Sequence, residues 1–98
     1  MINQAIDDYI VFLTVEKGAS NNTIEAYSND VRKLANYLED ENIHRWQQVE
    51  HVTIRGYLAL MQKENLTNTT RARNVAALKS FFRFLYMEKY TEYNLGEI

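Results

Sequence analysis

Hydrophobic residues recur along this chain at intervals of three and four positions, which is the spacing that places side chains on one face of an α-helix. The clearest case is the stretch from residue 67 to residue 89. Its apolar positions are Val75, Leu78, Phe82 and Leu85. Polar side chains precede them, and Asn68 or Thr69 can accept a hydrogen bond from the free backbone N–H groups of a helix start. The pattern therefore predicts a long helix here.

Two further helices are predicted in the first half of the chain. The first covers about residues 3–17, with Asn3 as a plausible cap, and Gly18 behind it can take the left-handed conformation that often ends helices. The second begins at Ser20 or Asn21 and ends at about residues 39–41. Both carry an apolar stripe with a polar opposite face, so both are expected to pack on other helices.

Residues 41–52 interrupt the period without being rich in glycine. We expect an ordered crossover that packs on the core, with Trp46 as its anchor, because a tryptophan buries a large area. Thr53 is predicted to cap a short third helix over about residues 54–63. Gly56 inside that helix costs up to about 1 kcal/mol relative to alanine, and it can allow a close helix crossing.

The composition agrees with a helical domain. The 98 residues contain no proline and only three glycines, and 46% of them are hydrophobic. After residue 89 the period fades, and Tyr90, Tyr93 and Leu95 are expected to fold back on the bundle. The sequence thus predicts a single all-α domain over residues 1–98.

Several classes of function find no support in the sequence. Because the chain has no cysteine, it has no disulfide, thiolate metal site or thiol nucleophile. His44 and His51 lack the carboxylate company that a metal site needs, so no metal and no cofactor are predicted. The chain shows neither a secretory signal nor an apolar run long enough to span a membrane. A cytoplasmic protein without a membrane partner is the expectation.

The charge is distributed unevenly. The net charge is −2, and residues 1–50 hold most of the acidic side chains. Residues 66–87 hold four basic side chains and no acidic one. Since salt screens charges beyond about 8–10 Å, an acidic total does not exclude a local basic surface. Such a face is either solvated or a binding face, and the single sign of its charges favours binding to a polyanion.

Candidate contacts to a polyanion lie on the second and fourth predicted helices. Helix starts with hydroxyl and amide side chains bind phosphate, and so do the cations that follow them. Arg32 and Lys33 are the weaker candidates, because isolated surface cations are common. The full set is Asn22, Thr23, Arg32, Lys33, Thr69, Thr70, Arg71, Arg73, Lys79 and Arg83.

Two motifs carry a resemblance to a known family. The second predicted helix contains Asn22-Thr23, Tyr27 and Asp30-Val31, and the fourth contains Arg73, Ala77, Leu78, Lys79, Phe82 and Leu85. In this order and spacing the chain resembles the N-terminal core-binding (SAM-like) domain of tyrosine recombinases, the phage integrase and Xer-type family. The resemblance covers about residues 6–95. Where the family domain usually ends in Asn-Pro, this chain has Asn94-Leu95.

The resemblance implies a four-helix bundle of two crossed helical hairpins whose second and fourth helices face duplex DNA. It implies that a separate catalytic domain, expected after residue 98, closes on the other side of the DNA. The tyrosine nucleophile of the family lies in that domain, so we assign no catalytic residue to this chain. The implied partners are double-stranded DNA, the covalently linked catalytic domain and other recombinase protomers.

Two other functions compete with this interpretation. A helical protein-interaction module without nucleic-acid binding could use the acidic residues around Asp7, Asp8 and residues 39–41 to meet a basic partner. An independent enzyme is less favoured, because no acidic pair stands near a histidine, a metal-ligand spacing or a phosphate loop.

Overall fold

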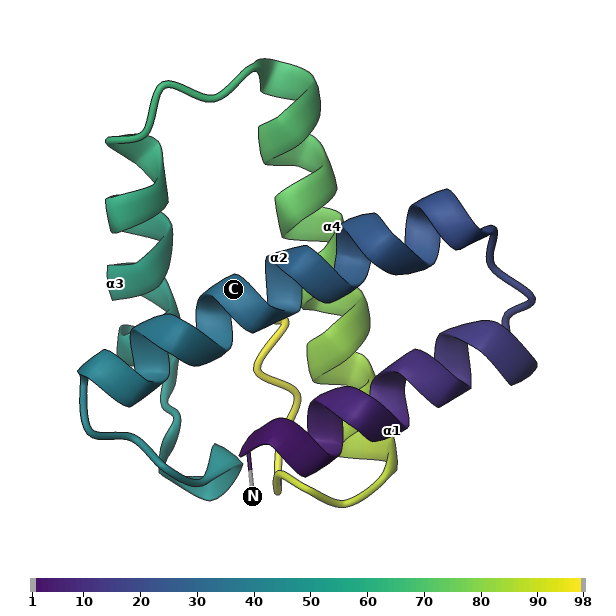
Figure 1. The fold of residues 1–98 in the computed structure, drawn as a ribbon. Helices are drawn as coiled ribbons and strands as arrows, with labels where there is room; N and C mark the ends of the chain where they lie inside the picture. Colours follow the sequence, from purple (N-terminus) through teal and green to yellow (C-terminus); the bar gives the residue numbers. More distant parts are fainter. Residues whose placement is uncertain (1, 98) are drawn as a thin grey trace.

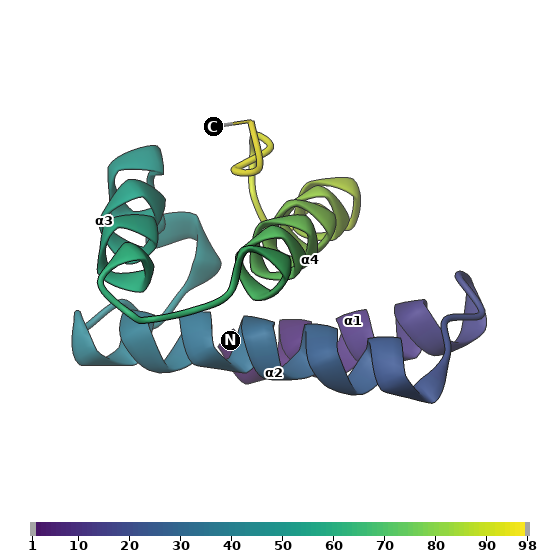
Figure 2. The same ribbon diagram turned by 90° about the horizontal axis from the view of Figure 1, so that it is seen from above.

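The computed structural model describes residues 2–97 and folds them into helices without a β-strand in that range. The elements are α1 (Ile2–Val15), α2 (Asn21–Asp40), the 3₁₀ helix η1 (Trp46–Gln48), α3 (His51–Gln62) and α4 (Asn68–Met87). In Figure 1, α1 and α2 form one hairpin, and α3 and α4 form a second that crosses it. Figure 2 shows the two hairpins as separate layers. The predicted all-α class, with two crossed helical hairpins, is confirmed.

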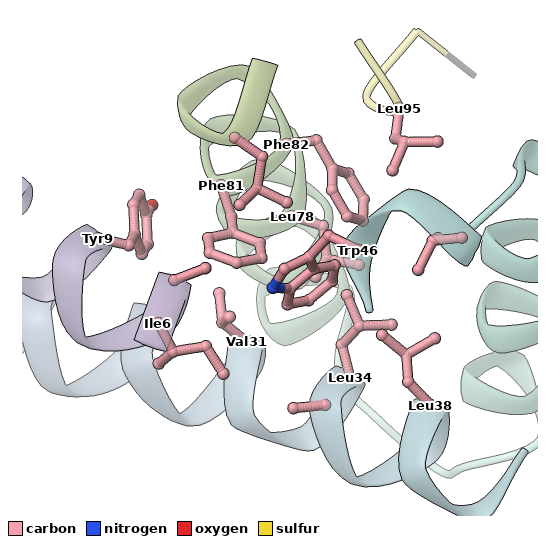
Figure 3. Packing of buried hydrophobic residues seen from close by; sticks show 14 of the residues in the cluster. Ile6, Tyr9, Val31, Leu34, Leu38, Trp46, Leu78, Phe81, Phe82 and Leu95 are labelled. Atoms are coloured by element: carbon pink, nitrogen blue, oxygen red, sulfur yellow. The ribbon is translucent and has the colours of Figure 1, made fainter. Parts of the chain in front are cut away.

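Trp46 anchors the crossover between the two hairpins. Its side chain is only 1% exposed, and its indole Nε1 donates a hydrogen bond to the carbonyl oxygen of Ile2 at 3.3 Å. The ring meets Phe81 of α4 edge-on, with 5.0 Å between the centroids, and Figure 3 shows it among side chains from both layers. The predicted role of Trp46 as a packing anchor is therefore confirmed.

The buried face of α4 is broader than the sequence pattern predicted. Leu78, Phe82 and Leu85 are buried as expected, but Val75 is 39% exposed. Phe81 and Phe84 are buried as well, because this side of α4 packs against Tyr9 of α1. Since α4 contacts the first hairpin on one side and the C-terminal segment on another, its apolar face is rotated away from Val75.

The first turn of α4 is capped one residue earlier than predicted. The hydroxyl of Thr67 accepts a hydrogen bond from the backbone N–H of Thr70 at 3.1 Å, so neither Asn68 nor Thr69 is the cap. Thr67 has extended backbone angles, as a cap requires. Residues 67–70 are all polar, so the sequence allows more than one cap. The observed hydrogen bond identifies which of them caps the helix.

Replacing Thr67 with alanine is expected to lower the free energy of unfolding by about 1 kcal/mol, because an N–H of the first turn loses its partner. Thr69→Ala is the matched control, since Thr69 is exposed one position inside the helix. We expect that control to change stability by less than about 0.5 kcal/mol. Urea unfolding followed by circular dichroism measures both, and equal losses would contradict the assignment of the cap.

The other helix ends also correct the predicted boundaries. α1 begins at Ile2, so Asn3 lies inside it and is not its cap. α3 begins at His51 after the cap residue Glu50, and the hydroxyl of Thr53 accepts a hydrogen bond from the N–H of Glu50 at 3.3 Å. Thr53 therefore supports the cap from the third helical position. Gly18 has a φ of 57°, as the predicted stop requires.

The segment after α4 folds back on the bundle. Leu95 is buried, and Figure 3 shows it beside Phe82. The hydroxyl of Tyr90 donates to the carboxylate of Asp8 on α1 at 2.6 Å, whereas Tyr93 remains exposed. The Tyr93 ring nevertheless meets the ring of His51 edge-on, with 5.5 Å between the centroids, so the predicted folding back holds for all three residues.

Gly56 lies where α3 approaches α2. A Cβ atom at this position would come within 3.0 Å of the hydroxyl oxygen of Tyr37. Tyr37 in turn packs against Tyr57, with 5.2 Å between ring centroids. The missing side chain of Gly56 therefore makes room for this contact between the two hairpins.

Candidate nucleic-acid interface

One face of α4 combines cations with small side chains. Five residues of this face are spaced three, four, three and four positions apart, so they fall on one line along the helix. All five are exposed, and we call them the α4 stripe: Thr69, Ala72, Ala76, Lys79 and Arg83. The chain carries no acidic residue from position 66 to position 87. Because the alanines add little bulk, a large anionic surface can approach the helix closely along this line.

Arg73 lies at the edge of this face, at the crossing of α2 and α4. Its Nε donates to Oδ2 of Asp30 at 3.0 Å and its Nη2 donates to Oδ1 at 2.9 Å. These hydrogen bonds raise the pKa of Arg73 above its usual value, and the guanidinium stays charged. Asp30 is only 6% exposed. The expectation that the cations of α4 have no counter-charge is therefore wrong for Arg73, because the carboxylate comes from another helix.

Two other predicted cations contact the end of α3 and the connection between α3 and α4. Lys33 forms an ion pair with Glu64, with 2.8 Å between Nζ and Oε2. Arg71 donates through Nη2 to the carbonyl oxygens of Gln62 at 3.4 Å and Glu64 at 3.3 Å. Both partners of the Lys33 pair are largely exposed, so the pair contributes little stability. The structure nevertheless separates Lys33 and Arg71 from the α4 stripe.

The helix starts hold the predicted hydroxyl and amide contacts in two different environments. Thr23 and Thr70 are half-buried, and each accepts a hydrogen bond from the hydroxyl of the cap before it. Asn22 and Thr69 are exposed beside them. Figure 1 shows that the starts of α2 and α4 lie at separate corners of the molecule. The structure therefore does not join them into one site.

The first halves of α2 and α4 do meet, and a shallow notch lies in the angle between them. We define the notch by its lining residues, which are Asn22, Glu25, Ala26, Asn29 and Arg73. Sequence reasoning did not select Asn29 as a site residue. A signal was present, because Asn22, Ala26, Asn29 and Lys33 are spaced four, three and four positions apart and so share one line of α2.

Arg32 of α2 is separate from both surfaces. Its side chain is exposed, and it makes no hydrogen bond within residues 2–97. Since adjacent helical residues point about 100° apart, Arg32 lies on a different line of α2 from Lys33. Of the ten predicted contacts, three belong to the α4 stripe (Thr69, Lys79 and Arg83) and two line the notch (Asn22 and Arg73), whereas the other five belong to neither surface.

Other chemical sites are not evident in the described part of the chain. Between residues 2 and 97 no three acidic or histidine side chains gather as metal ligands would. None of the helices described has the length and apolar character that crossing a membrane requires. Tyr9 is buried against Ser80, with 2.8 Å between the hydroxyl oxygens, and burial raises its pKa to about 12. Tyr9 is therefore part of the core.

Sequence comparison adds independent information to this geometry. Residues 6–89 match the family described as phage integrase, N-terminal SAM-like domain. The chain is 41% identical over 95 residues to a tyrosine recombinase XerC of Pelotomaculum thermopropionicum, covering 91% of this chain and 31% of that protein. It is 35% identical over 89 residues to a tyrosine recombinase XerD of Staphylococcus epidermidis, covering 91% of this chain and 30% of that protein.

A third relative, the tyrosine recombinase XerD of Listeria innocua, is 38% identical over 85 residues, which cover 86% of this chain and 29% of the relative. The chain therefore spans about three tenths of the length of the curated relatives it matches. No solved structure matches it significantly.

Proposed function

The chain belongs to the phage integrase N-terminal SAM-like domain family, and from this we propose that it is the DNA-binding domain of a site-specific tyrosine recombinase. In this role it clamps duplex DNA opposite a separate catalytic domain during DNA integration or recombination. The observation that supports the proposal most is the α4 stripe, an exposed helix face with cations, small residues and no acidic residue of its own.

The physical basis of binding is electrostatic. Duplex DNA carries a dense line of phosphates, and each cation that neutralises one releases condensed counterions. Lys79 and Arg83 on the α4 stripe are the leading candidates, and Arg73 adds positive charge at its edge. An α-helix about 10–12 Å across fits the major groove, so α4 can bring these side chains to phosphates or base edges.

The remaining parts of the proposed reaction lie outside this chain. We propose that the chain contributes no catalytic residue and that the nucleophile belongs to a covalently linked catalytic domain. Other recombinase protomers on the same DNA are proposed partners, and the proposed location is the cytoplasm. The length of the relatives supports this division, because the chain matches about three tenths of each.

A salt-dependent titration tests the proposal. Fluorescence anisotropy of a labelled duplex should rise with the concentration of this chain, at low affinity. With about three phosphates neutralised, the affinity should fall about fortyfold between roughly 50 and 200 mM salt. A single-stranded oligonucleotide and an uncharged polymer serve as comparisons. Absence of binding to the duplex at the lower salt concentration would contradict the proposal.

One observation favours a protein-interaction module as the second candidate. Val11 and Val15 of α1 are 60% and 72% exposed, and they lie four positions apart on the same side of the helix. Exposed apolar patches on a protein surface often mark protein contacts, and these two valines could form part of one. If the duplex does not bind, this surface becomes the leading site.

A further inference from the structure

We propose that Asp30 is a positioning residue, which holds the guanidinium of Arg73 in the notch so that its remaining donors bind one phosphate of a DNA duplex. The inference rests on the proposed function. The inference goes beyond that function by assigning the buried Asp30 a role in anion binding, and by proposing a DNA phosphate as the ligand of the notch.

The hydrogen bonds of Arg73 leave one part of its guanidinium available. An arginine has five N–H donors, one on Nε and two on each terminal nitrogen. Nε donates to Asp30, and Nη2 donates to Asp30 and to Oδ1 of Asn74 at 3.3 Å. Nη1 makes no hydrogen bond within residues 2–97, so its two donors remain for a ligand.

The burial of the two partners differs in the way that positioning requires. The Asp30 side chain is 7% exposed, whereas the Arg73 side chain is 40% exposed and lines the notch. One side of the guanidinium is therefore fixed in the protein while much of the side chain can be reached from solvent. A fixed arginine loses less side-chain entropy when it binds, because its geometry is already set.

The rest of the notch suits a phosphate group. Asn22 and Asn29 are exposed amides that can donate hydrogen bonds, and Ala26 between them leaves space. Glu25 is the one acidic residue among the lining residues, and its side chain is exposed. The Glu25 carboxylate can turn into solvent, whereas Asp30 is held against Arg73.

A positioning role and a pure charge effect predict opposite changes in DNA affinity when Asp30 is replaced. If only net charge mattered, replacing an acid beside a phosphate site with a neutral residue would strengthen DNA binding. If Asp30 positions Arg73, the same replacement frees the guanidinium and weakens binding. Asp30→Asn keeps the shape and one carbonyl acceptor while removing the charge, so the sign of its effect distinguishes the two roles.

The experiment compares Asp30→Asn with Glu25→Gln in the duplex titration. Both substitutions remove one negative charge at the same notch, but only the first touches Arg73. We expect Asp30→Asn to weaken binding about tenfold, the effect of losing one charged hydrogen bond, and to flatten the salt slope by about one unit. Glu25→Gln should raise the affinity, because it removes an acid from the notch and leaves the Asp30–Arg73 pair intact.

Two further variants keep the test decisive if Asp30→Asn is destabilised. Arg73→Lys keeps the positive charge but loses the forked geometry, and it should weaken binding as much as Arg73→Ala does. The double variant Asp30→Asn, Arg73→Ala should be no weaker than Arg73→Ala alone, because both changes remove the same contact. Circular dichroism at the titration temperature confirms that each variant is folded.

The outcomes separate this inference from the proposed function. If the unmodified chain binds the duplex and Asp30→Asn binds more tightly, or if Arg73→Lys binds normally, the positioning role is overturned while the DNA-binding function stands. If the unmodified chain does not bind the duplex, the proposed function itself fails. Weaker duplex binding by Asp30→Asn and by Arg73→Lys, with the fold retained in each, supports the inference.

Discussion

A chain in which both Lys79 and Arg83 are replaced with alanine is expected to bind duplex DNA at least a hundredfold more weakly than the unmodified chain. Each side chain contributes one charged contact, and each such contact is worth about a factor of ten or more. The salt slope should flatten by about two units, since two fewer phosphates are neutralised. Anisotropy titrations at several salt concentrations measure both quantities.

The matched control for this experiment is the double substitution Arg45→Ala, Arg55→Ala. These residues are exposed cations outside α2 and α4, so the control changes the net charge by the same amount. We expect it to change affinity by less than about threefold, because screened distant charges act weakly. Equal losses in the two double variants would show that binding follows overall charge and not the α4 stripe.

The single substitution Lys79→Ala should flatten the salt slope of duplex binding by about one unit, because one fewer phosphate is neutralised.

Replacing Phe81 with alanine is expected to lower the free energy of unfolding by about 3–5 kcal/mol. The ring of Phe81 is fully buried and lies 5.0 Å from Tyr9 and from Trp46, measured between ring centroids. It thus joins α1, the crossover and α4 in one contact. Small domains have total stabilities of about 5–15 kcal/mol, so this single change should leave the chain close to unfolding at 37 °C.

Val75→Ala is the control for this second prediction. Val75 lies on the same helix and was expected in the core, but it is partly exposed. Urea unfolding should show a loss of less than about 1 kcal/mol for this variant, because little buried surface is removed. A loss at Val75 that matched the loss at Phe81 would mean that α4 is rotated about its axis relative to the described packing.

The sequence was sufficient to predict the helices and the main packing anchor. Spacings of three and four identified the four helices, and the area of Trp46 indicated a buried crossover. The rotation of α4 could not be predicted, because apolar residues on several sides of this helix allow more than one buried face. Val75 and Phe81 show the difference, since only the neighbouring helices decide which of them is covered.

The sequence predicted where the candidate site lies but not which of its cations form ion pairs. The charge distribution identified α4, and the exposed positions of Lys79 and Arg83 agree with that choice. The Asp30–Arg73 ion pair joins residues 43 positions apart in the chain, and no local pattern signals it. Likewise, Lys33 meets Glu64 only because the connection between α3 and α4 comes against α2. Contacts between helices therefore decide which cations remain available.

The position of Trp46 provides a spectroscopic signal for the association of the two hairpins. It is the only tryptophan in the chain, and it is enclosed by α1 through the Ile2 carbonyl and by α4 through Phe81. Any separation of the hairpins would expose the indole to water and shift its emission to longer wavelengths. Fluorescence of the unlabelled chain can therefore reveal whether a bound duplex leaves the two layers packed or moves them apart.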